Sequence, residues 1–228
     1  MRKTIFASEE YYHIYNRGVE KRDIFEDKSD YLRFLESMSA FNTVEPVGSL
    51  YELSFDHSHL ATKSPSESDP LVEIVAYCLN PNHFHFLLKQ VAENGISQFM
   101  KRVAGGYSWY FNHRNHRSGS LFQGPFRAKH VTSNEYLLRL SAYVSLNDKV
   151  HSLGDQVAKY GEGISSWSDY VKTEPHSTSY YRGVKCSKDA VLGQFTSPLD
   201  YKKFAEETLT LIKENKEAER NLTAFSFD

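Results

Sequence analysis

Two short apolar runs near the middle of the chain constrain the fold more than any other feature. Residues 71–79 and 83–90 read as strands, and only Asn80-Pro81-Asn82 separates them. Proline fixes its own φ angle and asparagine side chains hydrogen-bond to nearby backbone, so these three residues favour a turn. We therefore expect two paired antiparallel strands and a protein that contains a β-sheet.

The second of these strands opens with two histidines, His83 and His85. Side chains alternate between the faces of a strand, so both imidazoles point to one face while Phe84 and Phe86 point to the other. Two imidazoles on one face can share a metal ion, but histidines in strands are more often solvated or satisfied by hydrogen bonds. A metal site therefore needs a further ligand from elsewhere in the chain.

The segment from Thr132 to Asn147 can supply that ligand. Thr132 and Glu135 have the spacing of a capping box, and neither glycine nor proline interrupts the residues that follow, so we expect a helix. One ridge of this helix carries Tyr136, Leu140, Tyr143 and Asn147. A phenol and a carboxamide then face the same direction, one turn apart. The alternative is that Tyr143 packs in the core and Asn147 caps the helix end.

The order of the elements predicts the fold class. We expect a strand at 10–16, a helix capped by Ser29, the paired strands, a helix at 96–110 and a strand near 126–131. The helix that carries Tyr143 follows them. The order β-α-β-β-α-β is that of a ferredoxin-like α+β fold.

Composition indicates one principal domain. With 228 residues and 40% hydrophobic content, the chain can bury one sizeable core and is short for two. We expect a domain at 1–175, with a polar insertion at about 56–70, and a C-terminal extension at 176–228 with one helix, Leu199 to Glu219. Two cysteines make no disulfide framework, and no apolar signal core or membrane span is found, so we expect a cytoplasmic protein.

The distribution of charge indicates an anionic partner in spite of the net charge of −2. No Asp or Glu occurs between Asn94 and Asn134. The cations that we expect to bind DNA there are Lys101, Arg102, Arg114, Arg117, Arg127 and Lys129. Aromatic residues are interleaved with them, so the stretch offers cations for phosphates and rings for the unstacked bases of single-stranded or hairpin DNA. The alternative is that many of the rings fill the core behind a solvated basic face.

Six motifs in a fixed order resemble one family. They are "YYHIYNRG" (11–18), "DYLRFL" (30–35), "YCLNPNHFHFLLK" (77–89), "GSLFQGPFRAKHV" (119–131), "EYLLRLSAYVSLN" (135–147) and "SSWSDY" (165–170). In this order they resemble the single-tyrosine HUH transposases of prokaryotic insertion sequences, and in particular the REP-associated tyrosine transposases. The resemblance covers roughly residues 9 to 172 and implies a ferredoxin-like fold as well.

The resemblance also implies roles for individual residues. His83 and His85 match the paired metal-binding histidines of the family, and Asn147 lies where the family has a polar third ligand. Tyr143 matches the single nucleophilic tyrosine, which would cleave DNA through a 5′-phosphotyrosine and leave a free 3′-OH. The mixed nitrogen and oxygen ligands favour Mg²⁺ or Mn²⁺.

The chain departs from the family pattern at two positions. Asp148 stands where the family commonly has proline, and Pro125 stands where it commonly has arginine. Neither change removes a presumed catalytic group. Pro125 puts one phosphate contact in doubt, although Arg127 and Lys129 lie nearby in the sequence.

Three hypotheses follow, and a metal-dependent tyrosine DNA transposase leads them. The second is a domesticated, non-catalytic protein that binds repetitive or hairpin DNA. The third is a metal-dependent hydrolase without a covalent tyrosine. The presence of Tyr143, His83, His85 and Asn147 together favours the first. The oligomeric state is also open, and a homodimer is one alternative, because the helix that carries Tyr143 can complete the active site of its own chain or that of a partner chain.

Overall fold

The computed structural model describes residues 4–45, 47–48, 50, 69–150, 164–167, 170, 184 and 186–224. Its centre is an antiparallel five-stranded sheet with the strand order β4-β1-β3-β2-β5. The strands are β1 (Tyr11–Arg17), β2 (Val72–Asn80), β3 (His83–Gln90), β4 (Arg127–His130) and β5 (Ile164–Ser165).

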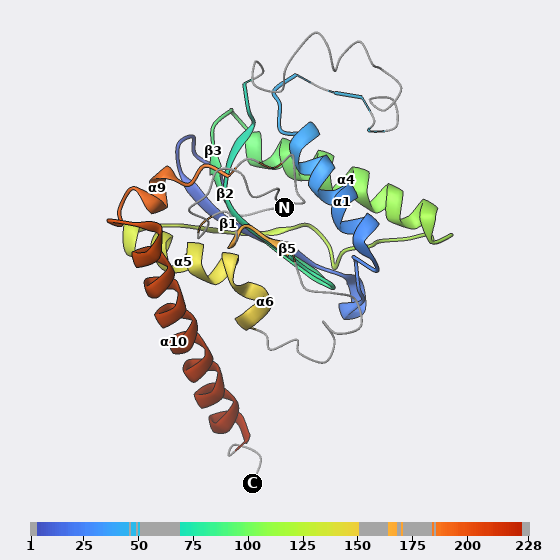
Figure 1. Cartoon of the computed structure of the whole chain (residues 1–228). Coiled ribbons are helices and arrows are strands. Elements are labelled where there is room, and N and C mark those ends of the chain that lie inside the picture. The colour runs from blue at the N-terminus through green and yellow to red at the C-terminus, as the bar shows by residue number, and fades with distance from the viewer. Residues whose placement is uncertain are drawn as a thin grey trace.

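Helices cover both faces of the sheet (Figure 1). One face packs against α1 (Lys28–Ala40) and α4 (Gly95–Arg114). The other packs against α5 (Asn134–Ser145) and α6 (Asn147–Val150), and α10 (Pro198–Ala224) packs against these two helices. The 3-10 turn η1 (Val19–Lys21) follows β1, and the short α9 (Asp189–Leu192) precedes α10. The order of β1, α1, β2, β3, α4 and β4 confirms the predicted ferredoxin-like α+β fold.

Alternation along β3 divides the core into two layers. Phe84 and Phe86 are fully buried toward α1, where both rings lie against Phe34. Leu87 points to the opposite layer, which α5 and α10 complete. The two histidines share the face of Leu87, so the sequence pattern that buries the phenylalanines also turns both imidazoles toward α5.

Three predicted helix boundaries were wrong by one or two residues. Asp27, not Ser29, caps α1, because its carboxylate accepts the backbone N–H groups of the first turn. Ser133, not Thr132, caps α5 through Tyr136 N. Helix α5 ends at Ser145, so Asn147 begins α6 instead of continuing the ridge of Tyr143.

The predicted C-terminal helix is α10, which extends beyond the expected limits. Its buried side chains are Tyr201, Ala205 and Thr208, and the Tyr201 hydroxyl lies 3.1 Å from Ser141 Oγ of α5. Leu211, by contrast, is 48% exposed. The predicted boundary at 175/176 and all but two residues of the insertion at 56–70 lie outside the described residues. None of the described helices is long and apolar enough to span a membrane.

One ion-pair cluster fastens α4 to α1. The Arg114 guanidinium pairs with Asp27 and with Asp30, whose side chain is fully buried. The arginine holds the pKa of the Asp27 carboxyl well below its usual range. Arg114 is thus a structural partner of the helix cap.

We expect Arg114→Ala to lower the free energy of unfolding by about 2 kcal/mol, because it leaves the Asp30 carboxylate buried without its cation. A depressed carboxyl pKa stabilises the fold fully above the unfolded value of about 3.9, and this contribution is lost progressively as the pH falls from there toward the lower pKa of the folded state. The variant should therefore also lose less stability than the parent between pH 7 and pH 3. Urea unfolding at both pH values measures this, with Lys101→Ala on the exposed side of α4 as the control. An unchanged midpoint at pH 7 would contradict the structural role.

Candidate functional site

His83 and His85 lie at the start of β3 with their rings close together. The ring centroids are 5.2 Å apart and the planes are almost perpendicular. Across the strand pairs, His83 faces Arg17 of β1 and Asn80 of β2, while His85 faces Tyr15. The predicted common face of the two imidazoles is therefore present.

The hydrogen bonds of His83 define its protonation. Its Nδ1 lies 2.6 Å from the Asn82 side-chain oxygen, which can only accept, so Nδ1 carries the hydrogen. The other ring nitrogen, Nε2, then has a lone pair, to which Asn80 Nδ2 donates at 3.0 Å. His83 thus presents an electron pair toward the interior of the site.

Asn147 completes this arrangement from α6. Its side chain is fully buried, and Oδ1 accepts from Asn80 Nδ2 at 2.8 Å. Oδ1 also lies 3.2 Å from His83 Nε2, so the two acceptors converge on one donor group. Sequence reasoning gave Asn80 only a role in the turn, because its residue type beside a proline suggested nothing more.

Tyr143 projects from α5 onto the same cluster. Its ring meets His85 edge-on with centroids 5.6 Å apart, and it meets His13 in the same way at 6.0 Å. Partial burial raises the pKa of the Tyr143 hydroxyl above its ordinary value, and the neighbouring Asn147 side chain opposes this effect. All four residues predicted as nucleophile or metal ligands therefore meet in one place, although Asn147 reaches it from the next helix.

The donor set could hold a divalent cation. Metal–nitrogen and metal–oxygen bonds to small divalent ions are about 2.0–2.2 Å long, so adjacent ligands of one six-coordinate ion lie roughly 3 Å apart. The 3.2 Å between His83 Nε2 and Asn147 Oδ1 fits this spacing. Within the described part of the chain, no cluster of three or more His, Cys, Asp or Glu residues has metal-binding geometry. The fit therefore depends on the asparagine oxygen.

A cleft of about 500 Å³ opens above these side chains. Tyr143, His83 and His85 line it together with Tyr15, Asn16, Arg17, Asn82, Gln123, Pro125 and Arg127. Pro125 is thus part of the wall. Arg17 brings a guanidinium to the same cleft, and its Nε is buried without a hydrogen-bond partner among the described residues. Sequence reasoning missed Arg17, because only the register of β1 against β3 places it opposite His83.

The six predicted DNA contacts are divided between the faces of the sheet. Arg127 and Lys129 lie on β4, and Arg127 reaches the cleft. Lys101, Arg102 and Arg114 lie on α4, across the sheet from α5 (Figure 1). Arg102 donates to the backbone oxygens of residues 43 and 44. The structure therefore does not bring the six cations into one continuous track.

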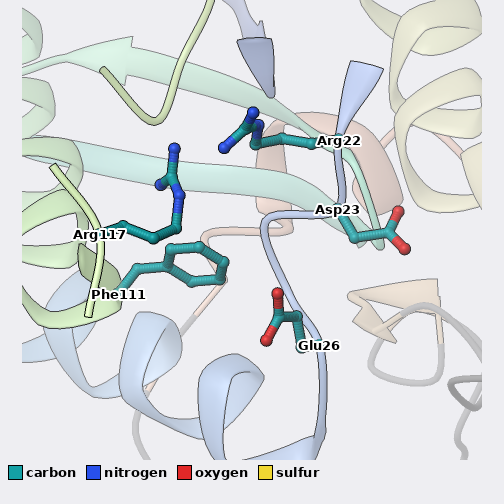
Figure 2. A pocket seen from close by; sticks show the side chains of 5 residues that line it. All are labelled: Arg22, Asp23, Glu26, Phe111 and Arg117. Carbon is teal, nitrogen blue, oxygen red and sulfur yellow. The ribbon is translucent and has the colours of Figure 1, made fainter. Parts of the chain in front are cut away.

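Arg117 lies in a second cavity of about 430 Å³, shown in Figure 2. The cavity is lined by Arg22, Asp23, Glu26, Phe111 and Arg117. Arg117 donates to Asn112 at 2.7 Å and lies over the Phe111 ring, and Arg22 donates to a backbone oxygen of η1. Both guanidinium groups thus have partners within the chain, and two carboxylates line the same space. The clustered tyrosine and histidines belong to the other cavity.

Comparisons with known proteins agree with the motif order. Residues 68–147 match the family model for IS200-like transposases, a stretch that includes both histidines, Tyr143 and Asn147. One similar solved structure is a REP-associated tyrosine transposase bound to a REP hairpin, with 12% identity, 75% of this chain and 84% of that chain covered, and a TM-score of 0.47. Another is a candidate transposase from Deinococcus radiodurans R1, with 16% identity, 60% and 91% covered, and a TM-score of 0.34. Among curated protein sequences, no significant match was found.

Proposed function

We propose that this chain, which carries an IS200-like transposase domain at residues 68–147, cleaves and rejoins single-stranded or hairpin DNA through a covalent bond to Tyr143. The observation that carries the proposal is that Tyr143 and His83 line one cleft, while the buried Asn147 oxygen lies 3.2 Å from His83 Nε2. A protein that only bound DNA would need the cleft and its cations but no nucleophile beside paired histidines.

The covalent step conserves the number of phosphodiester bonds. The Tyr143 oxygen attacks the phosphorus, the bond from phosphorus to the 3′ oxygen breaks, and the new bond makes a 5′-phosphotyrosine. The phenolic proton is lost and the departing 3′ oxygen gains one, so the strand leaves with a free 3′-OH. Attack of a 3′-OH on the phosphotyrosine reverses the step, restores the tyrosine and joins two strands. Neither direction requires a nucleoside triphosphate.

The residues around Tyr143 have separable roles in this proposal. A divalent ion of the Mg²⁺ or Mn²⁺ type, held by His83, His85 and Asn147, would polarise the phosphate and stabilise charge on the leaving oxygen. Arg17 of β1 and Arg127 of the neighbouring β4 line the same cleft, where their guanidinium groups would bind non-bridging oxygens of the DNA phosphate. Because burial favours the protonated phenol, the tyrosine remains uncharged until the substrate is in place.

The proposal can be tested with labelled DNA hairpins and single strands, Mn²⁺ and the full-length chain. A protein–DNA adduct that survives denaturation and retains label placed 3′ of the break, with release of the fragment 5′ of the break as a free 3′-OH end, is the expected result. Binding without an adduct or a break would favour the non-catalytic DNA-binding protein. Cleavage without an adduct would favour a hydrolase. Peptide mapping of the adduct to Tyr143 completes the assignment.

Arg17→Ala and Arg127→Ala should each weaken DNA binding and make it less dependent on salt. Each lost phosphate contact should flatten the log–log plot of affinity against salt by roughly 0.7 for a single strand. Fluorescence anisotropy with a labelled oligonucleotide at several salt concentrations measures both quantities. Lys101→Ala is the matched control, because Lys101 is an exposed cation of α4 on the other face of the sheet. Equal slopes for all three variants and the parent would place the DNA on another surface.

A further inference from the structure

His13 of β1 contacts the candidate site without lining its cleft. Its side chain is 8% exposed, and its Nε2 lies 2.8 Å from His85 Nδ1. The two rings are nearly parallel, with centroids 5.1 Å apart. Because the His13 ring also meets Tyr143 edge-on, its position is fixed from two sides.

A hydrogen bond between two neutral imidazoles needs one N–H and one lone pair. Two arrangements then satisfy the 2.8 Å contact. If His85 donates through Nδ1, its Nε2 keeps a lone pair. If His13 donates instead, His85 Nε2 carries a hydrogen and cannot act as a ligand.

The neighbouring histidine provides a precedent for the first arrangement. His83 donates through Nδ1 to the Asn82 oxygen, which leaves Nε2 as an acceptor within the site. His85 uses the same ring nitrogen, Nδ1, for its contact with His13. Ligand histidines commonly donate their second nitrogen to an oxygen or another acceptor, and this contact fixes both the tautomer and the ring orientation.

We propose that His13 is a positioning residue that accepts a hydrogen bond from His85 Nδ1 and so holds the His85 Nε2 lone pair toward the catalytic cleft. His13 does for His85 what Asn82 does for His83. The inference deepens the proposed function, because the lone pair matters to the reaction only if His85 serves there as a ligand. The hydrogen bond itself can be measured whether or not the protein cleaves DNA.

The tautomer of His85 is the first measurement. Long-range ¹H–¹⁵N correlation spectra of histidine-labelled protein distinguish protonated from unprotonated ring nitrogens, and His85→Gln assigns the His85 signals by their loss. The expected result is a protonated Nδ1 and an unprotonated Nε2 in the parent protein. A hydrogen on Nε2 and none on Nδ1 would overturn the proposal, even if no variant of His13 folded.

Two substitutions separate hydrogen bonding from packing. His13→Phe keeps an aromatic ring against His85 and Tyr143 but offers no acceptor, whereas His13→Gln offers an acceptor oxygen on a flexible side chain. We expect His13→Phe to weaken Mn²⁺ binding by roughly tenfold or more in calorimetry, and His13→Gln to restore much of the affinity. His130→Phe is the control, because His130 is a partly exposed histidine of β4 that pairs with Glu10.

The experiments distinguish failure of the positioning role from failure of the proposed function. If His13→Phe binds Mn²⁺ like the parent and leaves the His85 tautomer unchanged, His13 is only a packing residue and the proposal fails. If the parent shows the expected tautomer and metal binding but forms no covalent DNA adduct, the proposed function fails and the positioning role stands.

Discussion

Tyr143→Phe is expected to reduce DNA cleavage and adduct formation to below about one thousandth of the parent rate, because it removes the nucleophilic oxygen. DNA affinity should change by less than about twofold, since the ring contacts with His85 and His13 do not involve that oxygen. Single-turnover cleavage of a labelled oligonucleotide and anisotropy with the same DNA measure the two quantities. Loss of cleavage with retained binding is the result that identifies a nucleophile.

Tyr15→Phe is the matched control for this experiment. Tyr15 lines the same cleft, and its ring stacks against His85 with centroids 5.6 Å apart. The substitution removes one hydroxyl from the wall of the same cleft, so it tests whether the loss of any tyrosine hydroxyl from the cleft abolishes cleavage. We expect the Tyr15 variant to cleave at nearly the parent rate. Parent-like cleavage by Tyr143→Phe, or an adduct that maps to Tyr15, would reject the assignment.

The sequence predicted the sheet well because β3 alternates so strongly. Phe84 and Phe86 can be buried together only if His83 and His85 face the other way. The short turn at Asn80-Pro81-Asn82 brings the preceding strand, β2, against β3 as an antiparallel partner. Helix starts were less certain. Ser29 lies two residues after Asp27, and Thr132 lies directly before Ser133, so several side chains in each segment could cap. The preference between them depends on backbone angles that residue types alone do not fix.

The site was predictable only in part, for a similar reason. Tyr143 and Asn147 are close in sequence, and the motif order related them to the histidines. His13 and Arg17 belong to the site because β1 pairs with β3, which brings together residues about seventy positions apart. No local pattern contains that register.

The predicted basic track failed to form one surface because of layer geometry. Cations that are close in sequence separate when a helix packs on one face of a sheet and the next strand turns its side chains to the other. Arg114 and Arg127 are separated in this way, and Arg114 is engaged by two aspartates instead. A stretch without acidic residues thus indicates an anionic partner but not which of its cations share one face.

Loss of either candidate imidazole ligand should have the second largest effect. We expect His83→Ala and His85→Ala each to weaken Mn²⁺ binding by tenfold or more and to lower cleavage by a similar factor at limiting Mn²⁺. Asn147→Ala should act in the same direction, because it removes the oxygen that lies 3.2 Å from His83 Nε2. Calorimetry with Mn²⁺ in the absence of DNA measures binding separately from chemistry. Chelation of the divalent ion should stop cleavage by the parent protein and leave its fold intact.

His116→Ala is the control for these substitutions, because His116 is an exposed histidine in the loop after α4. It removes one imidazole without touching the cleft, so its Mn²⁺ affinity should equal that of the parent. Calorimetry can also separate a shared site from two independent ones. If one ion binds between the histidines, the double variant His83→Ala/His85→Ala should bind none at the concentrations that saturate the parent. Unchanged Mn²⁺ affinity in both single variants would show that the two imidazoles serve only the hydrogen-bond network of Asn80, Asn82 and His13.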